Sequence, residues 1–435
     1  MLRRLFDKIN ELPPDQQRWL IAGAFIAGQA FIWFVLFETL WYGDRSISDL
    51  PVYYTYAGRM AQGMMPYRDF ALEYPPVAML LFSLPRFISG PPYDTFVKLF
   101  EIEMFAFNCG ITVLLSIAAW KMWRSRKKLA GVLGVYTFFL LALGSIVELR
   151  FDLAAAFIIL ASLVCFITDR YLFAWLLIGI GFMTKEVPAL LAPLFLIIHW
   201  RRRQLGELWM GPLAAALAAL IVSLPFLIAS PTGLANAFLY HVERPLQIES
   251  SWSSPLLLAG RFGGFSLRIM NAYGSHNVYS SLSNTFVTLS TPVTALLLIG
   301  GYILFYRWGD SGGEAREGLA GGWGAAQLPR FALVAVGAFI FAGKVFSPQF
   351  LIWVIPLVAL VKGAGRRWVI GLFAGVLILT QIEFPFNYWR LLELNAAVVS
   401  LVSIRNILLG ATLVFTLVSL VKKARGRESG EHTHP

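Results

Sequence analysis

The chain has 435 residues, of which 57% are hydrophobic and only 14% are charged, and its mean hydropathy is +0.66. A soluble domain has about 25% charged residues, so the composition excludes a soluble fold. Repeated apolar runs of about 20 residues predict an all-α polytopic membrane protein. The net charge of +11 does not indicate nucleic-acid binding, because the basic residues fall in short loops between apolar runs.

Twelve apolar runs predict a bundle of about 12 transmembrane helices. They lie at residues 19–40, 95–120, 129–147, 152–168, 172–183, 187–200, 208–229, 284–306, 330–343, 349–361, 367–383 and 397–421. Two shorter apolar stretches, 77–90 and 254–270, are rich in Pro, Gly or Arg, and we expect them to be helices in the membrane interface.

The basic residues predict the orientation of these helices. Most of them fall in loops on the side of both termini, which places that side in the cytosol and the protein in the plasma membrane. We expect a cytosolic segment over residues 1–18, one transmembrane catalytic domain over 19–421 and a basic cytosolic tail over 422–435. The first residues lack the pattern of a cleavable signal peptide.

The predicted extracytoplasmic loops hold the ionisable residues at the helix ends. Such groups are costly at a span end unless they are paired or functional. The first of these loops, 43–93, is polar and rich in Tyr and turns. We therefore expect the functional site on this face.

Asp49 is the candidate catalytic residue of the first loop. In a helix, Asp49, Tyr53 and Tyr56 would share one face at i, i+4 and i+7. The alternatives are a helix N-cap for Asp49 and an aromatic belt for the tyrosines. The same loop supplies four more candidate substrate-binding residues: Tyr67, Asp69, Glu73 and Tyr74.

Two later junctions add candidate cations. Arg150 and Asp152 lie in Glu-Leu-Arg-Phe-Asp, where Arg150 would bind a phosphate in bidentate fashion and Asp152 would orient it or a sugar hydroxyl. The alternative is a local ion pair between the two. Lys185 would be a second cation near the same phosphate, or would extend toward the interface.

The loop 230–253 is long for a connection between spans, and long ordered loops are often functional. Its candidates are His241, Arg244 and Glu249, as an anion or sugar site; a structural histidine is the alternative for His241. Lys344 and Gln349 lie in a tight connection further along the chain. The two cysteines, Cys109 and Cys165, lie in apolar runs, and the sequence contains no disulfide framework, nucleotide-binding signature or metal motif.

Four stretches together carry a family pattern. They are Asp49-x3-Tyr53 with Gly63-x2-Pro66-Tyr67, Phe70 and Tyr74-Pro75-Pro76; Arg150-Phe-Asp152; Lys185-x2-Pro188; and Lys344-x2-Ser347-Pro348-Gln349. In this order they resemble the polyprenyl-phosphate-dependent mannosyltransferases of glycosyltransferase family 87, within the GT-C superfamily. The resemblance implies an inverting enzyme with a sugar on polyprenyl phosphate as donor and Asp49 as the base.

The chemistry of such a transfer matches the residue types. An acceptor hydroxyl that attacks the anomeric carbon needs a base, and the departing phosphate needs preorganised cations, for which Arg150, Lys185, Arg244 and Lys344 are the candidates. We expect no cofactor, and the sequence does not imply a metal. The expected partners are a lipid or glycan acceptor and the surrounding membrane lipids, with no nucleic acid, and we expect a monomer. The alternatives are a lipid-linked sugar flippase or transporter, which would show internal repeats, and a ligase or phosphotransferase with the same donors.

Overall fold

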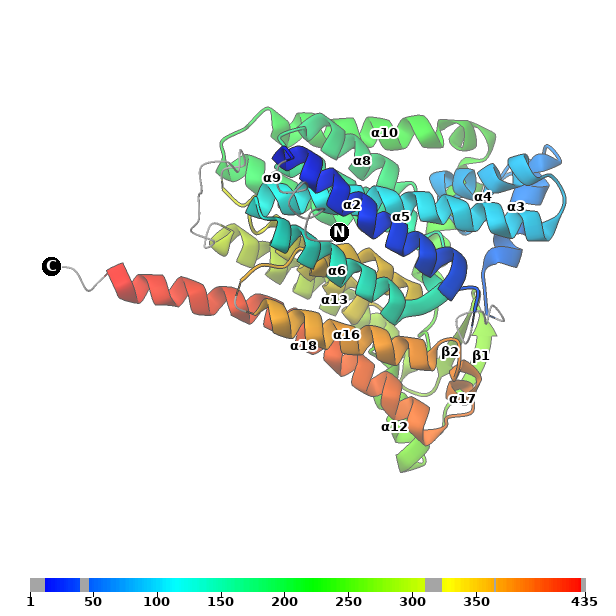
Figure 1. The fold of residues 1–435 in the computed structure, drawn as a ribbon. Coiled ribbons are helices and arrows are strands. Elements are labelled where there is room, and N and C mark those ends of the chain that lie inside the picture. The colour runs from blue at the N-terminus through cyan, green and yellow to red at the C-terminus, as the bar shows by residue number, and fades with distance from the viewer. Residues whose placement is uncertain (1–11, 40–46, 310–322, 364, 432–435) are drawn as a thin grey trace.

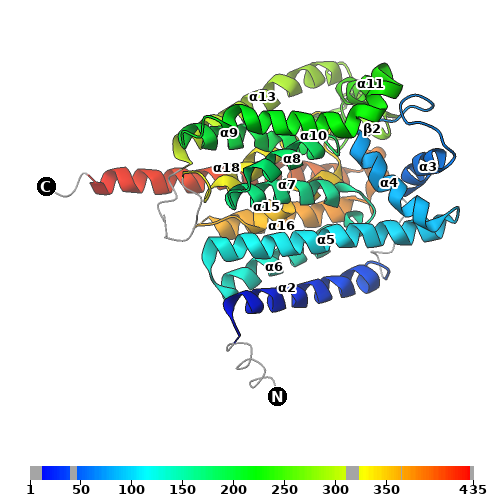
Figure 2. The ribbon, with the colours of Figure 1, turned by 90° about the horizontal axis from the view of Figure 1, so that it is seen from above.

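The computed structural model describes residues 12–39, 47–309, 323–363 and 365–431. In these ranges the chain is mainly helical, with one two-stranded hairpin (Figures 1 and 2). Six helices are long and apolar enough to cross a membrane, at Pro14–Leu36, Tyr93–Trp123, Arg126–Val147, Glu207–Ala229, Ser283–Trp308 and Ala396–Val418. The chain is therefore an all-α polytopic membrane protein, as its composition predicts.

Each of the twelve apolar runs contains a helix. The helices are α2 (Pro14–Phe31, continued by the π-helical turn η1, Ile32–Leu36), α5 (Tyr93–Trp123), α6 (Arg126–Leu143), α7 (Asp152–Ile167), α8 (Tyr171–Phe182), η4 with α9 (Val187–Leu191 and Ala192–Arg201), α10 (Glu207–Ala229), α13 (Ser283–Trp308), α14 (Leu328–Ala342), η5 with α15 (Pro348–Trp353 and Ile355–Ala359), α16 (Arg366–Glu383) and α18 (Ala396–Glu431). The last of them continues through most of the predicted basic tail. The six remaining runs form helices that are shorter or less apolar than the six above.

The short helix α7 lies in the centre of the bundle (Figure 2). Most of its side chains are buried on every side, which is the pattern of a helix surrounded by others. It packs against α5, α8 and the η5 turn. Because Arg150 and Asp152 lie at the start of α7, this packing fixes their position at one end of the bundle.

The helices run alternately between two ends of the bundle. At one end, Val77 N donates to Met183 O (2.8 Å) and Gln247 N donates to Lys344 O (3.1 Å), so loops far apart in sequence meet there. At the other end, the Arg202 side chain reaches Trp323 O (3.1 Å). The described parts of the loops predicted to be extracytoplasmic are joined at the first end by contacts of Arg150 with Asp49, Lys185 with Asp152, His241 with Glu73 and Lys344 with Val242. We call this end the site end and the opposite one the basic end.

The site end carries the shorter elements (Figure 1). They are α3 (Leu50–Ala61), α4 (Pro76–Ser89), α11 (Pro231–Glu243), α12 (Ser253–Gly263), the strands β1 (Arg268–Ala272) and β2 (Ser275–Tyr279), and α17 (Tyr388–Leu392). The strands are antiparallel, with Ala272 opposite Ser275. Tyr273 and Gly274 between them both have positive φ (55° and 64°), as a tight hairpin turn requires.

The prediction of one interfacial helix over 254–270 is wrong in its second half. The helix α12 ends at Gly263, and Gly264 adopts the left-handed conformation (φ 67°) that terminates a helix. Arg268 already belongs to β1. The predicted stretch 77–90 is helical as α4, and residues 40–46 of the first loop lie outside the described ranges.

Candidate active site

Asp49 immediately precedes α3, and its side chain does not cap the helix. Ser48 Oγ instead accepts a hydrogen bond from Leu50 N (3.2 Å). The Asp49 carboxylate turns toward Arg150, with 2.6 Å between Oδ1 and Nη1. The alternative, a helix N-cap formed by the Asp49 side chain, is therefore wrong. The Asp49 carboxylate is 34% exposed, and the Arg150 side chain beside it is 5% exposed.

A set of packed aromatic rings holds Asp49 in this position. The Tyr53 ring stacks on Phe82 at 4.1 Å and contacts Phe151 edge-on, and its hydroxyl donates to Asp49 Oδ2 at 3.4 Å. Burial, followed by the negative charge of Asp49, raises the pKa of Tyr53 well above its usual value. Tyr53 therefore stays protonated and can donate this hydrogen bond to Asp49. Tyr53 itself is only 1% exposed.

Arg150 remains charged despite its burial. Desolvation is the largest single effect and disfavours the cation, but Asp49 together with Tyr53, Tyr74 and Asp152 outweighs it, and the pKa of Arg150 is raised. The predicted alternative, a local pair between Arg150 and Asp152, does not occur: no ion pair joins them in the described parts of the chain. Each finds its partner in another segment.

Asp152 pairs with Lys185. Its Oδ1 accepts from Lys185 Nζ (2.6 Å) and from Trp353 Nε1 (2.7 Å). The ammonium group also lies over the rings of Phe151 (4.5 Å) and Trp353 (5.0 Å), where cation–π attraction adds to the ion pair. Asp152, with a side chain 1% exposed, thus positions Lys185 and does not face an open surface.

Glu73 connects the first loop to α11. Tyr56 Oη donates to Glu73 Oε2 (2.6 Å), and His241 Nε2 lies 3.0 Å from Glu73 O. Burial, then the hydrogen bond to Glu73, raises the pKa of Tyr56, and burial lowers the pKa of His241. The structure thus brings together three residues that the sequence could only place in two separate loops.

Arg244 and Lys344 form a pair of like charges. Arg244 Nη2 donates to Ser275 Oγ (3.0 Å) and Lys344 Nζ donates to Val242 O (2.5 Å). No carboxylate in the described ranges lies within 4.0 Å of either. Burial lowers the pKa of both, and the neighbouring Arg244 lowers that of Lys344 further. Asp49 and Glu73 act on Arg244 only at longer range, and two cations held together without a direct ion-pair partner are an arrangement expected of an anion site.

The side chains of the other predicted residues form hydrogen bonds with neighbouring residues of the protein. Glu249, 2% exposed, accepts from Gln247 Nε2 (2.9 Å), and Gln349 Oε1 accepts from Ser347 (2.6 Å). Burial, then the charge of Glu383, raises the pKa of Glu249 well above its usual value.

Tyr67 and Asp69 close the turn after α3. Tyr67 Oη donates to Tyr74 O (2.6 Å), and both tyrosine rings are largely covered. Asp69 accepts from Arg68 Nε (2.8 Å) and Met65 N (2.7 Å). The Arg68 and Met65 hydrogen bonds lower the pKa of Asp69 to about 2. Asp69 therefore forms hydrogen bonds only with nearby residues of the same exposed turn, among the described contacts.

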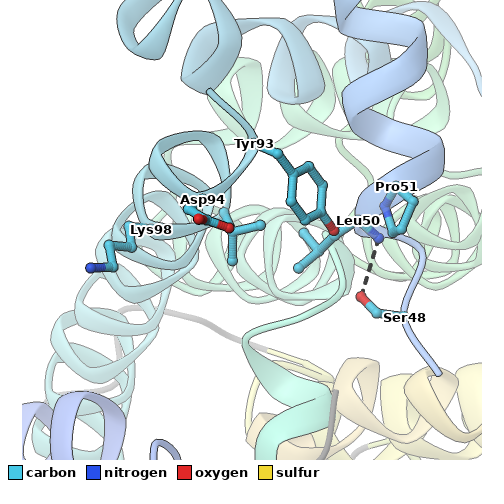
Figure 3. A pocket seen from close by; sticks show the side chains of 7 residues that line it. Ser48, Leu50, Pro51, Tyr93, Asp94 and Lys98 are labelled. Carbon is cyan, nitrogen blue, oxygen red and sulfur yellow. Dashed lines mark hydrogen bonds between the residues drawn. The ribbon is translucent and has the colours of Figure 1, made fainter. Parts of the chain in front are cut away.

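Two features at the site end were missed by sequence reasoning. One is the fully buried pair of Arg405 and Glu383, 3.6 Å apart; an arginine inside an apolar run was the available signal. The other is a cavity of about 480 Å³ beside the start of α3 (Figure 3). It is lined by Ser48, Leu50, Pro51, Tyr93, Asp94, Val97 and Lys98, while the Asp49 carboxylate points instead to Arg150.

In the described ranges, no group of three or more His, Cys, Asp or Glu side chains could hold a metal ion. No protein-family model and no curated protein matches the chain. Among solved structures, the chain is similar to the crystal structure of ArnT from Cupriavidus metallidurans in the apo state. The identity is 14% and the TM-score 0.48, over 95% of this chain and 78% of that one. A likeness at this level does not assign a function to this chain.

Proposed function

We propose that the protein is a membrane glycosyltransferase. It would move a hexose, mannose, from polyprenyl phosphate to a hydroxyl of a lipid or glycan acceptor at the extracytoplasmic face. The observation that supports this most directly is a partly exposed carboxylate, Asp49, that shares one end of the bundle with Arg150 and with the cations Arg244 and Lys344, which form no direct ion pair with a described carboxylate.

Asp49 acts as the general base in this proposal. The acceptor hydroxyl oxygen attacks the anomeric carbon opposite the phosphate, the new C–O bond forms, and the hydroxyl proton passes to Asp49. The bond between the anomeric carbon and the phosphate oxygen breaks with inversion, through an oxocarbenium-like state as in glycoside hydrolysis. Arg150 and the Tyr53 hydroxyl keep Asp49 oriented before the attack, and the N–H groups of Arg150 that do not contact Asp49 bind the donor phosphate.

The cations take up the charge of the leaving group. Polyprenyl phosphate departs with its bonding electron pair, so negative charge grows on the phosphate as the bond breaks. Arg244 and Lys344, already fixed by Ser275 and the Val242 carbonyl, need little rearrangement to meet this charge, and preorganised cations stabilise such states strongly. Lys185 is held close to Asp152 and contributes its charge at longer range.

One experiment separates this activity from transport. The purified protein in liposomes is given radiolabelled polyprenyl-phosphate mannose together with a lipid extract of the producing membrane. We expect label to appear on a second lipid or glycan, with inverted anomeric configuration. Label that only moves between leaflets while it remains on polyprenyl phosphate would support a flippase and contradict the proposal.

The orientation is part of the proposal and has its own test. We propose that the site end is extracytoplasmic, that both termini are cytosolic in the plasma membrane, and that the protein acts as a monomer. With Cys109 and Cys165 replaced, a membrane-impermeant thiol reagent applied to whole cells should label Glu393→Cys at the site end but not Lys127→Cys at the basic end. The opposite pattern would reverse the orientation.

A further inference from the structure

The basic end contains a second cavity, of about 260 Å³, lined by Trp200, Arg201, Arg203, Leu205 and Tyr306. It lies where the last turn of α9, the connection to α10 and the last turn of α13 meet. The candidate active site is at the opposite end of the bundle, so this cavity cannot belong to it. Its lining combines two arginines with large apolar side chains.

The three consecutive arginines at the end of α9, Arg201 to Arg203, make different contacts. Arg202 turns inward: its Nε and Nη2 donate to Trp323 O (3.2 and 3.1 Å), its Nη1 donates to Tyr171 Oη (2.9 Å), and Asp169 lies 3.8 Å away. Arg202 thus ties the connection together. Arg201 and Arg203 are exposed and line the cavity.

The charges of Arg201 and Arg203 have no acidic partner in the described ranges, where no carboxylate lies within 4.0 Å of them. Arg201 is nevertheless fixed, because its guanidinium group lies over the rings of Tyr306 (4.7 Å) and Trp323 (4.9 Å). Stacking on aromatic faces leaves the N–H groups at the edge of the guanidinium plane free to donate. This is a preorganised donor set for a phosphate.

An exposed apolar stripe on α13 leads to this cavity. Its members, spaced three or four residues apart on one face of the helix, are Leu296 (68% exposed), Ile299 (54%), Ile303 (48%) and Tyr306 (42%). The stripe ends at Tyr306, which also lines the cavity. A free phosphate ion would make no favourable contact with these apolar side chains, whereas the acyl chains of a lipid would cover them.

We propose that this cavity binds the phosphate headgroup of an anionic phospholipid, with Arg201 and Arg203 as donors and the acyl chains along α13. Basic pockets between membrane helices are known to hold anionic headgroups, and Trp200 and Tyr306 are residue types that settle at the headgroup level. The site is independent of sugar transfer, because none of its residues belongs to the site end.

The test is a lipid titration of the purified full-length protein, followed by native mass spectrometry. With phosphatidylglycerol we expect a bound lipid that phosphatidylcholine does not replace. The double variant Arg201→Gln/Arg203→Gln should bind phosphatidylglycerol about 10- to 30-fold more weakly, from the loss of two direct hydrogen-bond donors to the headgroup. The control Lys127→Gln/Lys128→Gln removes the same charge from exposed residues at the same end and should bind as the wild type does.

Four results would overturn the proposal. Equal weakening in both double variants would mean diffuse attraction to the basic end. Displacement of the lipid by inorganic phosphate, or equal affinity for a short-chain phosphatidylglycerol, would mean an anion site without a lipid. If the double variant does not fold, Arg201→Lys/Arg203→Lys keeps the charge but loses bidentate geometry, and unchanged lipid binding in that variant would contradict the assigned donors.

Discussion

Two ion pairs at the site end use the same chemistry in different surroundings. Asp49 and Arg150 are 2.6 Å apart, and the carboxylate is 34% exposed. Glu383 and Arg405 are 3.6 Å apart and completely buried. Arg405 also donates to Glu249 O (2.6 Å) and lies over the Phe346 ring (4.2 Å), so every side of it is occupied by protein.

The difference separates a pair that can react from a pair that can only hold helices together. A substrate can reach Asp49 through its exposed face, whereas nothing outside the protein can reach Glu383. A buried pair contributes little net stability, but the removal of one partner leaves an uncompensated charge. We therefore expect changes at Asp49 to affect turnover and changes at Arg405 to affect folding.

The largest expected effect is that of Asp49→Asn on sugar transfer. An amide has nearly the same shape but cannot accept the proton, and a general base contributes about 10²- to 10⁴-fold to the rate. We expect turnover to fall by this factor while donor affinity stays close to wild type. Thermal unfolding should change less than in Arg405→Met, because the amide oxygen can still accept a hydrogen bond from Arg150. Glu393→Gln, which neutralises an exposed carboxylate at the same end, serves as the control. If Asp49→Asn instead failed to fold, the Asp49–Arg150 pair would have the structural role that we assign to Glu383 and Arg405.

Arg405→Met should give the opposite result. It leaves the buried carboxylate of Glu383 without its partner, and such a loss costs about 3–5 kcal/mol. We expect a much lower unfolding temperature in detergent. The double variant Arg405→Met/Glu383→Gln should recover a large part of this loss, because no unpaired charge remains. If Arg405→Met unfolds as the wild type does, the buried pair has no structural role.

Arg150 combines the properties of the two ion pairs, because its own side chain is buried but its partner Asp49 is partly exposed. The variant Arg150→Ala therefore tests both properties. A hydrogen bond to a charged group is worth about 1.5–3 kcal/mol, so we expect about 10- to 100-fold weaker donor binding, measured with labelled polyprenyl-phosphate mannose. Arg150→Lys keeps the charge and should recover part of the affinity. An unchanged dissociation constant in Arg150→Ala would remove Arg150 from the phosphate site.

Asp69→Asn should have the smallest effect, since Asp69 and Arg68 form an exposed pair. The pKa of Asp69, lowered to about 2 by Arg68 and Met65 N–H, lies below the unfolded value of about 3.9. The stabilisation is therefore present above about pH 4 and lost as the pH falls toward 2. Unfolding temperatures of wild type and Asp69→Asn should differ slightly at pH 5 and converge near pH 2. A gap that persists at pH 2 would contradict the assigned cause.

The sequence predicted the helices better than the contacts of the site. Apolar length is a strong signal, so every run contains a helix, and the 254–270 stretch failed only because Gly264 ended α12 early. The pairing of Asp49 with Arg150 joins segments about 100 residues apart, and no local pattern encodes that choice. Local reasoning offered a pair of Arg150 with Asp152 as an alternative, whereas the packing of α3, α7 and the η4 region gives each a distant partner.

Burial was the other property that sequence patterns did not reveal. Tyr53, Asp152 and Glu249 were predicted to face a substrate, and all three lie at or below 2% exposed. Their spacing on a helix or loop showed which face they share but not which neighbours cover that face. Arg405 and Glu383 were missed for the same reason, because α16 and α18 pack together only in the folded chain.

The most direct measurement is a structure of the Asp49→Asn protein with polyprenyl-phosphate mannose bound. We predict that the donor phosphate contacts one or more of Arg150, Arg244 and Lys344, and that the anomeric carbon lies within reach of a hydroxyl hydrogen-bonded to residue 49. A donor phosphate held at the basic end, or a sugar far from residue 49, would contradict the role of Asp49 as the base.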